Sequence, residues 1–300
     1  MNRFLVFSLA LLFVACGGRQ SVLMQDATNT APVDAAKAEA LAAEAQTLWA
    51  QRGELDKANA AIAKWEEAAR ADASNPMYQR ELSNAYYFLN NVHVRWTEDE
   101  DARKAQELAN YNKGVEAAER ALGLANPAFA ALIKSGEDSD EVWMKALKSA
   151  RKEDVKTLYW YAVHLAKWAK LHSIPMILKY KNRAMLVIQK CKSLEPEFFH
   201  GGPSRYLGTY WAALPGFAGK DTAKSKVHFD EAIKIDSTYL DTKVLYARWY
   251  ATNADDEELF KKLLTEVANA DPAAIPELVP ENKNAQRIAK QLLENIEDYF

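Results

Sequence analysis

The sequence is poor in residues that break helices and in residues that cross-link chains. Of 300 residues, 11 are Gly and 10 are Pro, whereas the two together make up about 12% of an average protein. This scarcity excludes a collagen-like chain, a disordered chain and a turn-rich β-sandwich. The 2 Cys residues cannot build a disulfide framework. The formal net charge of −3 gives no general attraction to nucleic acid, so we expect no nucleic-acid partner.

Alanine and other helix-forming residues take the place of the missing types. The sequence contains 51 Ala, and Ala has the highest helix propensity of all residues. Hydrophobic residues make up 49% and charged residues 26%, as in a soluble protein with a sizeable core. The composition therefore predicts an all-α fold.

The chain begins with a short basic start and a brief apolar run. Arg3 precedes residues 4–15, which are apolar except for Ser8. A twelve-residue helix spans about 18 Å, too short for a hydrocarbon core of about 30 Å. The run therefore predicts a cleaved secretory signal peptide at residues 1–15.

The apolar run ends in Leu-Phe-Val-Ala-Cys-Gly-Gly at residues 12–18, which resembles a bacterial lipoprotein signal. The resemblance implies acylation of Cys16, for example with palmitate, and attachment to the periplasmic side of a membrane. Ordinary secretion, with Cys16 incidental, is the alternative. Because Gly17 rather than Asp follows the cysteine, we expect the outer membrane rather than the inner one. Polar residues 16–34 predict a flexible tether ahead of a single helical domain at 35–300.

Beyond the tether, apolar residues recur at helical spacing in consecutive segments. An acid or Asn precedes Pro at Pro76, Pro127, Pro196 and Pro272, and residues 236–237 form a fainter marker. The intervals are 51, 69, 41 and 35 residues, of which only the last fits the tetratricopeptide period of about 34. We interpret the chain as an irregular tetratricopeptide-like helical-repeat superhelix, an α-solenoid. An all-α bundle without repeats is the alternative.

No group of residues has the spacing of a known catalytic or metal site. The 5 His residues form no His-Glu-x-x-His motif, and the phosphate-binding Gly motifs and the Gly-x-Ser-x-Gly motif are missing. We therefore predict that the protein is not an enzyme and has no catalytic residue, metal or cofactor. Catalysis by a site without a known motif is the alternative.

Aromatic residues are unusually dense, with 8 Trp and 13 Tyr. Residues 155–171 are apolar nearly all round, which indicates a central helix. Tyr and Trp offer a large apolar area with a polar tip, which suits an elongated apolar or amphipathic ligand. We predict a lined cavity, with Arg205 available for an anionic head group. Its candidate residues are Trp160, His164, Trp168, Arg205, Tyr206, Tyr210, Trp211, Tyr246 and Trp249. The alternative is that most of them are ordinary core residues.

Short segments of the C-terminal half stand in the order found in one transporter family. They are Leu-Tyr-Trp at 158–160, Leu-Glu-Pro at 194–196, Phe-Phe-His-Gly-Gly-Pro at 198–203, Arg-Tyr-Leu-Gly at 205–208, Pro-Gly-Phe-Ala-Gly-Lys-Asp at 215–221, His-Phe-Asp-Glu-Ala-Ile at 228–233, Lys-Val-Leu-Tyr-Ala at 243–247, Glu-Leu-Phe at 258–260 and Asp-Tyr-Phe at 298–300. This ordered set resembles the T component (TatT) of tripartite ATP-independent periplasmic (TRAP) transporters. The N-terminal half matches in helix pattern and lipoprotein start, and its residues match loosely.

This resemblance implies a lipid-anchored periplasmic accessory protein that binds the solute-binding protein, or P subunit, of a TRAP transporter. It also implies a tetratricopeptide-like scaffold with a pocket for a hydrophobic ligand such as an organic acid, and assembly as a homotrimer. A protein-interaction scaffold of the cell envelope with no small ligand is the alternative function.

Overall fold

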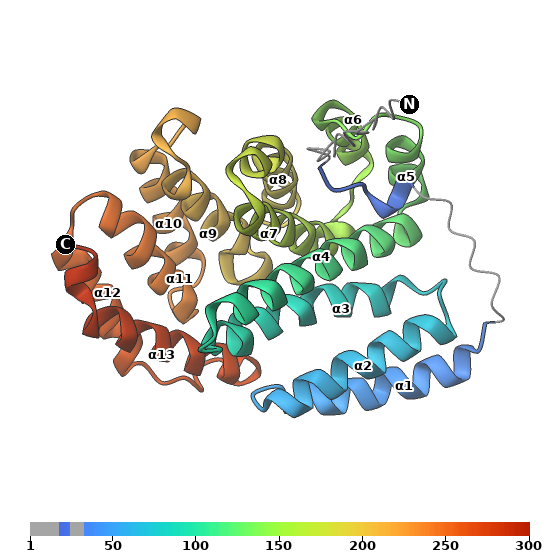
Figure 1. Cartoon of the computed structure of the whole chain (residues 1–300), viewed down its shortest axis with the longest axis horizontal. Coiled ribbons are helices and arrows are strands. Elements are labelled where there is room, and N and C mark those ends of the chain that lie inside the picture. Colours follow the sequence, from blue (N-terminus) through green and yellow to red (C-terminus); the bar gives the residue numbers. More distant parts are fainter. Residues whose placement is uncertain (1–17, 25–32) are drawn as a thin grey trace, which may run out of the picture.

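Every regular element in residues 18–24 and 33–300, the part that the computed structural model describes, is a helix. The prediction of an all-α fold is confirmed for this part of the chain (Figure 1). Cys16 and the expected signal peptide lie outside the described residues. The α-helices are α1 (Ala35–Trp49), α2 (Leu55–Ala71), α3 (Pro76–Phe88), α4 (Glu100–Ala125), α5 (Pro127–Lys134), α6 (Asp140–Ala146), α7 (Val155–His172), α8 (Ile174–Leu194), α9 (Phe198–Ala213), α10 (Thr222–Ile235), α11 (Leu240–Leu245), α12 (Glu257–Asn269) and α13 (Val279–Glu294). Two π-helical turns, η2 (Leu89–His93) and η7 (Tyr246–Ala251), continue α3 and α11.

Asn-Pro pairs begin two of these helices. The side-chain oxygen of Asn75 accepts a hydrogen bond from the Met77 amide at 3.0 Å, and that of Asn126 accepts one from the Phe129 amide at 3.0 Å. Each Asn thereby satisfies an amide that has no partner inside the helix. The Pro that follows has a φ already suited to the first helical position.

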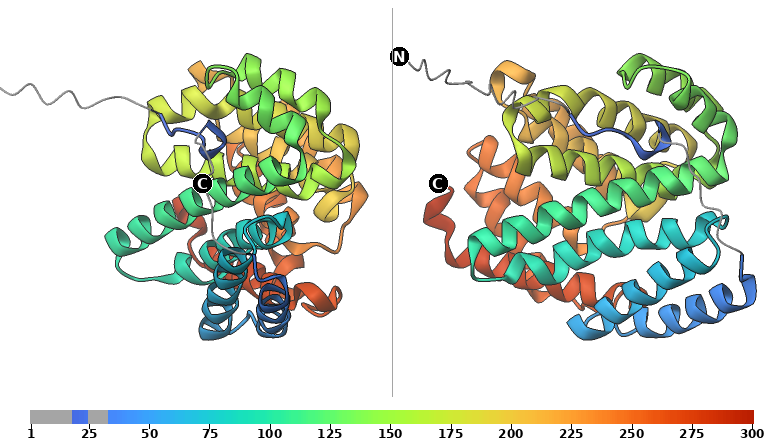
Figure 2. Two further views of the ribbon diagram at one scale, coloured as in Figure 1. Left: turned by 90° about the vertical axis from the view of Figure 1, so that its right-hand side faces the viewer. Right: turned by 45° about the vertical axis from the view of Figure 1, so that its right-hand side comes forward.

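Consecutive helices pack as pairs. α1 packs on α2, α3 on α4, α7 on α8, and α9 on α10, while α4 packs on α7 and joins the middle pairs (Figure 2). The buried apolar residues form separate clusters in α1–α3, in α4–α8 and in α10–α13. Such division into neighbouring cores is the pattern of a helical-repeat superhelix, in which each unit contacts its neighbours.

A glycine sets the close approach of α4 to α7. A Cβ added to Gly114 would overlap the imidazole ring of His164, which is fully buried in α7. His164 Nε2 lies 2.7 Å from the carbonyl oxygen of Ser83 in α3. Because a carbonyl only accepts hydrogen bonds, Nε2 must carry the proton. His164 of α7 therefore contacts both α3 and α4.

The last helix returns to the first helix pairs and closes the superhelix. Arg52, between α1 and α2, donates from Nε and Nη2 to the Glu281 carboxylate of α13 at 3.1 and 2.9 Å. Trp96 Nε1 donates to Asn284 Oδ1 at 2.9 Å, and Asn284 Nδ2 donates to the carbonyl oxygen of Asn91 at 3.0 Å. Figure 1 shows that α13 begins near α2 and α3 and runs from there toward the C-terminus. The N-terminal and C-terminal helices thus share one wall of the interior.

Residues 18–24 fall in the segment where the sequence predicts a flexible tether, and they lie against the folded domain. They end in the short helix η1 (Val22–Met24), which contacts α4 and α5. Figure 2 shows this segment at the opposite end of the molecule from α1 and α2. Within residues 18–24 and 33–300, no helix has the length and apolar character that crossing a bilayer requires.

Candidate functional site

A cavity of about 260 Å³ lies where the closed superhelix brings six regions of the chain together. Six of its lining residues are aromatic, and they come from α1, α3, α7, the start of α9 and the segment before α11. The lining residues are Gln46, Trp49, Arg52, Asn84, Tyr87, Phe88, Asn91, Val92, Trp160, Phe199, Tyr239, Glu277, Leu278 and Glu281. We call this space the aromatic cavity.

The rings of the aromatic cavity contact one another in a continuous series. The Trp160 ring centroid lies 4.8 Å from that of Tyr87 and 5.2 Å from that of Phe199. Phe199 in turn lies 5.3 Å from Tyr239. Tilted and edge-on ring pairs at these distances are the favoured aromatic geometries. The series forms a continuous aromatic wall.

An unusual backbone turn places Phe199 in this wall. Phe199 and His200 have φ of 48° and 55°, and Gly201 follows with a φ of 73°. A non-glycine residue in the left-handed region costs about 1–3 kcal/mol unless its surroundings hold it there. Arg205 provides that support, because its Nη atoms donate to the carbonyl oxygens of Phe199 and His200 at 3.1 Å each.

Further contacts fix Arg205 itself. Its Nη1 also donates to Thr242 Oγ1 at 3.2 Å, and its guanidinium carbon lies 4.4 Å from the centre of the Tyr239 ring. The His200 ring also stacks on the Tyr239 ring, with the two centroids 5.3 Å apart. Its Nδ1 lies 2.6 Å from Asp236 Oδ2. Arg205 is 3% exposed. It therefore positions two cavity-lining rings.

A second cavity, of about 320 Å³, has a lining that is joined to the lining of the aromatic cavity by one hydrogen bond. Asn91 lines the aromatic cavity, and its Oδ1 accepts a hydrogen bond at 3.2 Å from Arg95, which lines the second cavity. The lining residues of the second cavity are Arg95, Arg248, Ile288, Gln291, Leu292, Asn295, Asp298 and Tyr299. We call this space the cationic cavity, because two Arg residues face a single carboxylate in its wall.

Two Lys residues of α7 extend this positive charge. The Lys167 side chain reaches water, yet the surrounding protein lowers its pKa to about 8, mainly by desolvation and then by repulsion from Lys170, Arg95 and Arg248. Asp241 is the acid that acts in the opposite direction on Lys167. Burial, followed by the charge of Arg248, also lowers the pKa of both Arg95 and Lys170. Cations that repel one another in a confined space favour a bound anion.

The structure places the nine predicted cavity residues in several different environments. Of these nine residues, all of which the structure describes, Trp160 alone lines the aromatic cavity. His164 packs on Gly114 in the core, and Arg205 supports the Phe199 turn. The Trp168 ring contacts Tyr180 of α8, with centroids 5.9 Å apart.

The remaining members of the set lie in α9 and η7. Tyr246 donates to Asp230 Oδ1 at 2.6 Å. Trp249 lies under Lys170, whose Nζ is 4.7 Å from the ring centre. Tyr210 contacts Trp211 with centroids 5.2 Å apart, and burial raises the pKa of both Tyr206 and Tyr210.

Sequence reasoning missed Tyr87, Phe199 and Tyr239, and it missed the cations. The Phe-Phe-His-Gly-Gly run at 198–202 signals a tight turn that carries an aromatic residue. Lys167 and Lys170 are the Lys residues in the largely apolar run 158–171 of α7. A positive charge at such a place is a usable signal of a water-filled interior.

The fold and the two cavities define a class of protein, a closed helical-repeat superhelix with cavities between its helices. In residues 18–24 and 33–300, no group of three or more His, Cys, Asp or Glu side chains could hold a metal ion. The family model of the TRAP transporter T-component (TAtT) matches residues 55–300. The chain belongs to this family, and the resemblance seen in the sequence is confirmed. A search of curated proteins gives no significant match.

Proposed function

We propose that this T component binds a small organic anion, with an aromatic or apolar body, in its two cavities. One observation carries the proposal: the hydrogen bond from Arg95 to Asn91 joins the lining of a ring-lined space of about 260 Å³ to that of a space of about 320 Å³, which Arg95 and Arg248 line. The rings suit the apolar body, and the cations suit a carboxylate. Pockets for small ligands span about 300–1,000 Å³, which fits a metabolite better than a peptide.

The same proposal includes the partner and the anchor. Membership of the T-component family supports a role as an accessory of a TRAP transport system rather than as a catalyst. We propose that the protein binds the solute-binding P subunit and assembles as a homotrimer, both on the basis of that family. The sequence around Cys16 supports acylation and attachment to the periplasmic face of the outer membrane.

Native mass spectrometry of protein purified from its own host tests the ligand proposal. The wild-type chain is expected to carry a co-purified small anion. Trp160→Ala removes the central ring of the aromatic wall, so we expect the occupied fraction to fall severalfold. Trp211→Ala is the matched control, because the Trp211 ring lies 4.4 Å from Lys224 Nζ on α10 and lines neither cavity.

Two results would contradict the proposal. If Trp160→Ala and Trp211→Ala carried the co-purified anion to the same extent, the aromatic cavity would be excluded as its binding site. A wild-type protein that carries no small molecule, and still captures the P subunit, would favour the scaffold function without a ligand.

A further inference from the structure

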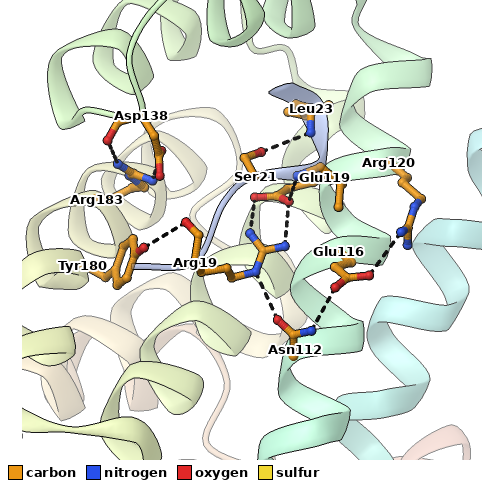
Figure 3. A network of polar contacts seen from close by, with 11 residues as sticks. Arg19, Ser21, Leu23, Asn112, Glu116, Glu119, Arg120, Asp138, Tyr180 and Arg183 are labelled. Atoms are coloured by element: carbon orange, nitrogen blue, oxygen red, sulfur yellow. Dashed lines mark hydrogen bonds and ion pairs between the residues drawn. The ribbon is translucent and has the colours of Figure 1, made fainter. Parts of the chain in front are cut away.

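The first described residues of the chain lie against α4 and α8. Arg19 donates from Nη1 to Glu119 Oε1 at 2.7 Å and from Nη2 to Glu119 Oε2 at 2.8 Å (Figure 3). Its Nε donates to Asn112 Oδ1 at 3.3 Å. From α8, the Tyr180 hydroxyl donates to the carbonyl oxygen of Arg19 at 3.1 Å. The segment is therefore held from both sides by directed hydrogen bonds.

The buried carboxylate of Glu119 has its charged partner and a backbone hydrogen-bond donor in this segment. The side chains of Arg19 and Glu119 are 8% and 1% exposed. Desolvation raises the pKa of Glu119, while the Arg19 charge and the Val22 amide, which donates at 2.9 Å, favour the carboxylate. A buried carboxylate is stable only with such partners. Here residues 19 and 22 supply the positive charge and a backbone donor.

Two glycines make room for the segment. A Cβ on Gly18 would overlap Lys179 Nζ and the Tyr180 hydroxyl, and a Cβ on Gly123 would approach Leu23 Cδ2 to 2.7 Å. A side chain at either position would require the ends of these neighbouring side chains to shift. Residues 18–24 thus form a clasp, the name we use for them from here on.

The clasp limits where a lipid on Cys16 can reach. Cys16 precedes Gly18 by two residues, and two residues span at most about 7 Å. Acyl chains on Cys16 would therefore leave the protein beside Lys179 and Tyr180 of α8. A long flexible linker would impose no such restriction.

The surface of α8 at this point suits a lipid headgroup layer. Ile174 and Leu178 are exposed apolar residues, with Leu178 next to the exposed Lys179. α8 contains no Asp or Glu between residues 174 and 194. Arg183 pairs with Asp138 and Asp140 of the neighbouring segment. Lys192 pairs with Glu231 of α10, and the other Lys residues of the helix are Lys179, Lys181 and Lys190. Apolar residues among Lys residues are typical of membrane-contacting helices.

We propose that the clasp holds the α8 face of the domain against the membrane leaflet that carries the acyl chains of Cys16. This inference rests on the lipid anchoring included in the proposed function. It assigns the bilayer as the partner of this face and leaves the opposite end, formed by α1 and α2, directed away from the membrane (Figure 2).

The test uses the full chain, expressed with its own leader in a bacterial host and reconstituted into vesicles of phosphatidylethanolamine and phosphatidylglycerol. A thiol-reactive fluorophore is placed at Leu178→Cys on α8 or at the exposed Leu55→Cys on α2. Cys191 is buried, and burial raises the pKa of its thiol, so it should not compete. A nitroxide at the lipid headgroup is expected to quench the Leu178 label severalfold more strongly than the Leu55 label.

Two variants connect this result to the clasp. Arg19→Ala should lower quenching at Leu178 to the level at Leu55, whereas Lys226→Ala, which breaks an exposed ion pair of α10, should not. A twelve-residue Gly-Ser insertion after Gly17 leaves the clasp intact and lengthens the link to the lipid. It should abolish the difference between the two labels even if Arg19→Ala impairs folding.

The outcomes separate this inference from the lipid anchor. If mass spectrometry finds no acyl chain on Cys16, the anchor fails and the membrane-facing surface fails with it. If an acylated protein shows equal quenching at the two labels, or if the insertion leaves the difference unchanged, the anchor stands and the role of the clasp is refuted. Protection of the Leu178 label by a bound P subunit instead of lipid would also overturn it.

Discussion

His164 gives the sharpest quantitative prediction. It is fully buried, and desolvation lowers its pKa from 6.5 to about 4, with a partly opposing effect from the Ser83 carbonyl. Its Nδ1 has no hydrogen-bond partner among the described residues. Protonation would therefore place an unpaired charge between α3, α4 and α7.

The sign and size of the effect follow from proton linkage. Between pH 6.5 and pH 4 the unfolded state binds more protons at this residue than the folded state, so stability decreases as the pH falls. From these two pKa values, His164 should lower the free energy of unfolding by about 2 kcal/mol at pH 5 and about 3 kcal/mol at pH 4, with little effect at pH 7.

The perturbation is His164→Gln, which keeps a side-chain amide able to donate to the Ser83 carbonyl and does not titrate. Urea unfolding followed by circular dichroism, at pH 7, 6, 5 and 4, gives the free energy of unfolding of both proteins. Subtraction removes the contributions of the other titrating groups. We expect the wild type to lose about 2 kcal/mol more than the variant between pH 7 and pH 5.

Parallel pH profiles for the two proteins would refute this reasoning. They would mean that the imidazole has water or a counter-charge in the folded protein. Weaker retention of the co-purified anion by His164→Gln at pH 7 would also contradict a purely structural role for His164.

Three further predictions concern the cavities and the helix packing. Because Lys167 has a pKa of about 8, its ammonium loses its proton between pH 7 and pH 9, and retention of the anion after dialysis should decrease over this range. Lys167→Gln should remove this pH dependence. Retention by the wild type that does not change with pH would contradict the prediction. The single ammonium of Arg205→Lys cannot replace the donors to both carbonyl oxygens, so the free energy of unfolding, measured in urea, should fall by about 2 kcal/mol. An unchanged free energy of unfolding would show that the turn at Phe199 is stable without these hydrogen bonds. Gly208→Ala places a Cβ 2.8 Å from the buried Phe229 ring, which should destabilise the fold by about 1–3 kcal/mol through overpacking. The midpoint temperature of thermal unfolding should therefore fall. An unchanged midpoint would mean that the Phe229 ring can move aside.

Local signals in the sequence predicted the helices well. The Asn-Pro pairs at 75–76 and 126–127 begin helices because the same cap and ring geometry operates wherever they occur. The π-helical turn η7 was not anticipated, since apolar spacing over 239–250 fits an ordinary α-helix. Ring contacts between η7 and α10 accompany this widened turn, and they are visible only in three dimensions.

The candidate site was harder to predict, for a physical reason. α7 is apolar nearly all round, so periodicity identifies it as central and does not say which side faces the cavity. Trp160 and Trp168 are eight residues apart, and they face different neighbours, Phe199 and Tyr180. The aromatic cavity also needs Glu281 and Arg52, which meet only because the superhelix closes on itself across 229 residues of chain.

The buried pairing of Arg19 with Glu119 has a practical consequence for work in solution. A recombinant chain that omits the predicted signal peptide and tether would begin at Ala35, the first residue of α1. Such a shortened protein would retain all thirteen α-helices and leave the Glu119 carboxylate without its guanidinium, a loss of about 3–5 kcal/mol for a buried pair. Beginning the recombinant chain at Gly17 instead would keep the salt bridge and omit Cys16, the residue that we propose to be acylated.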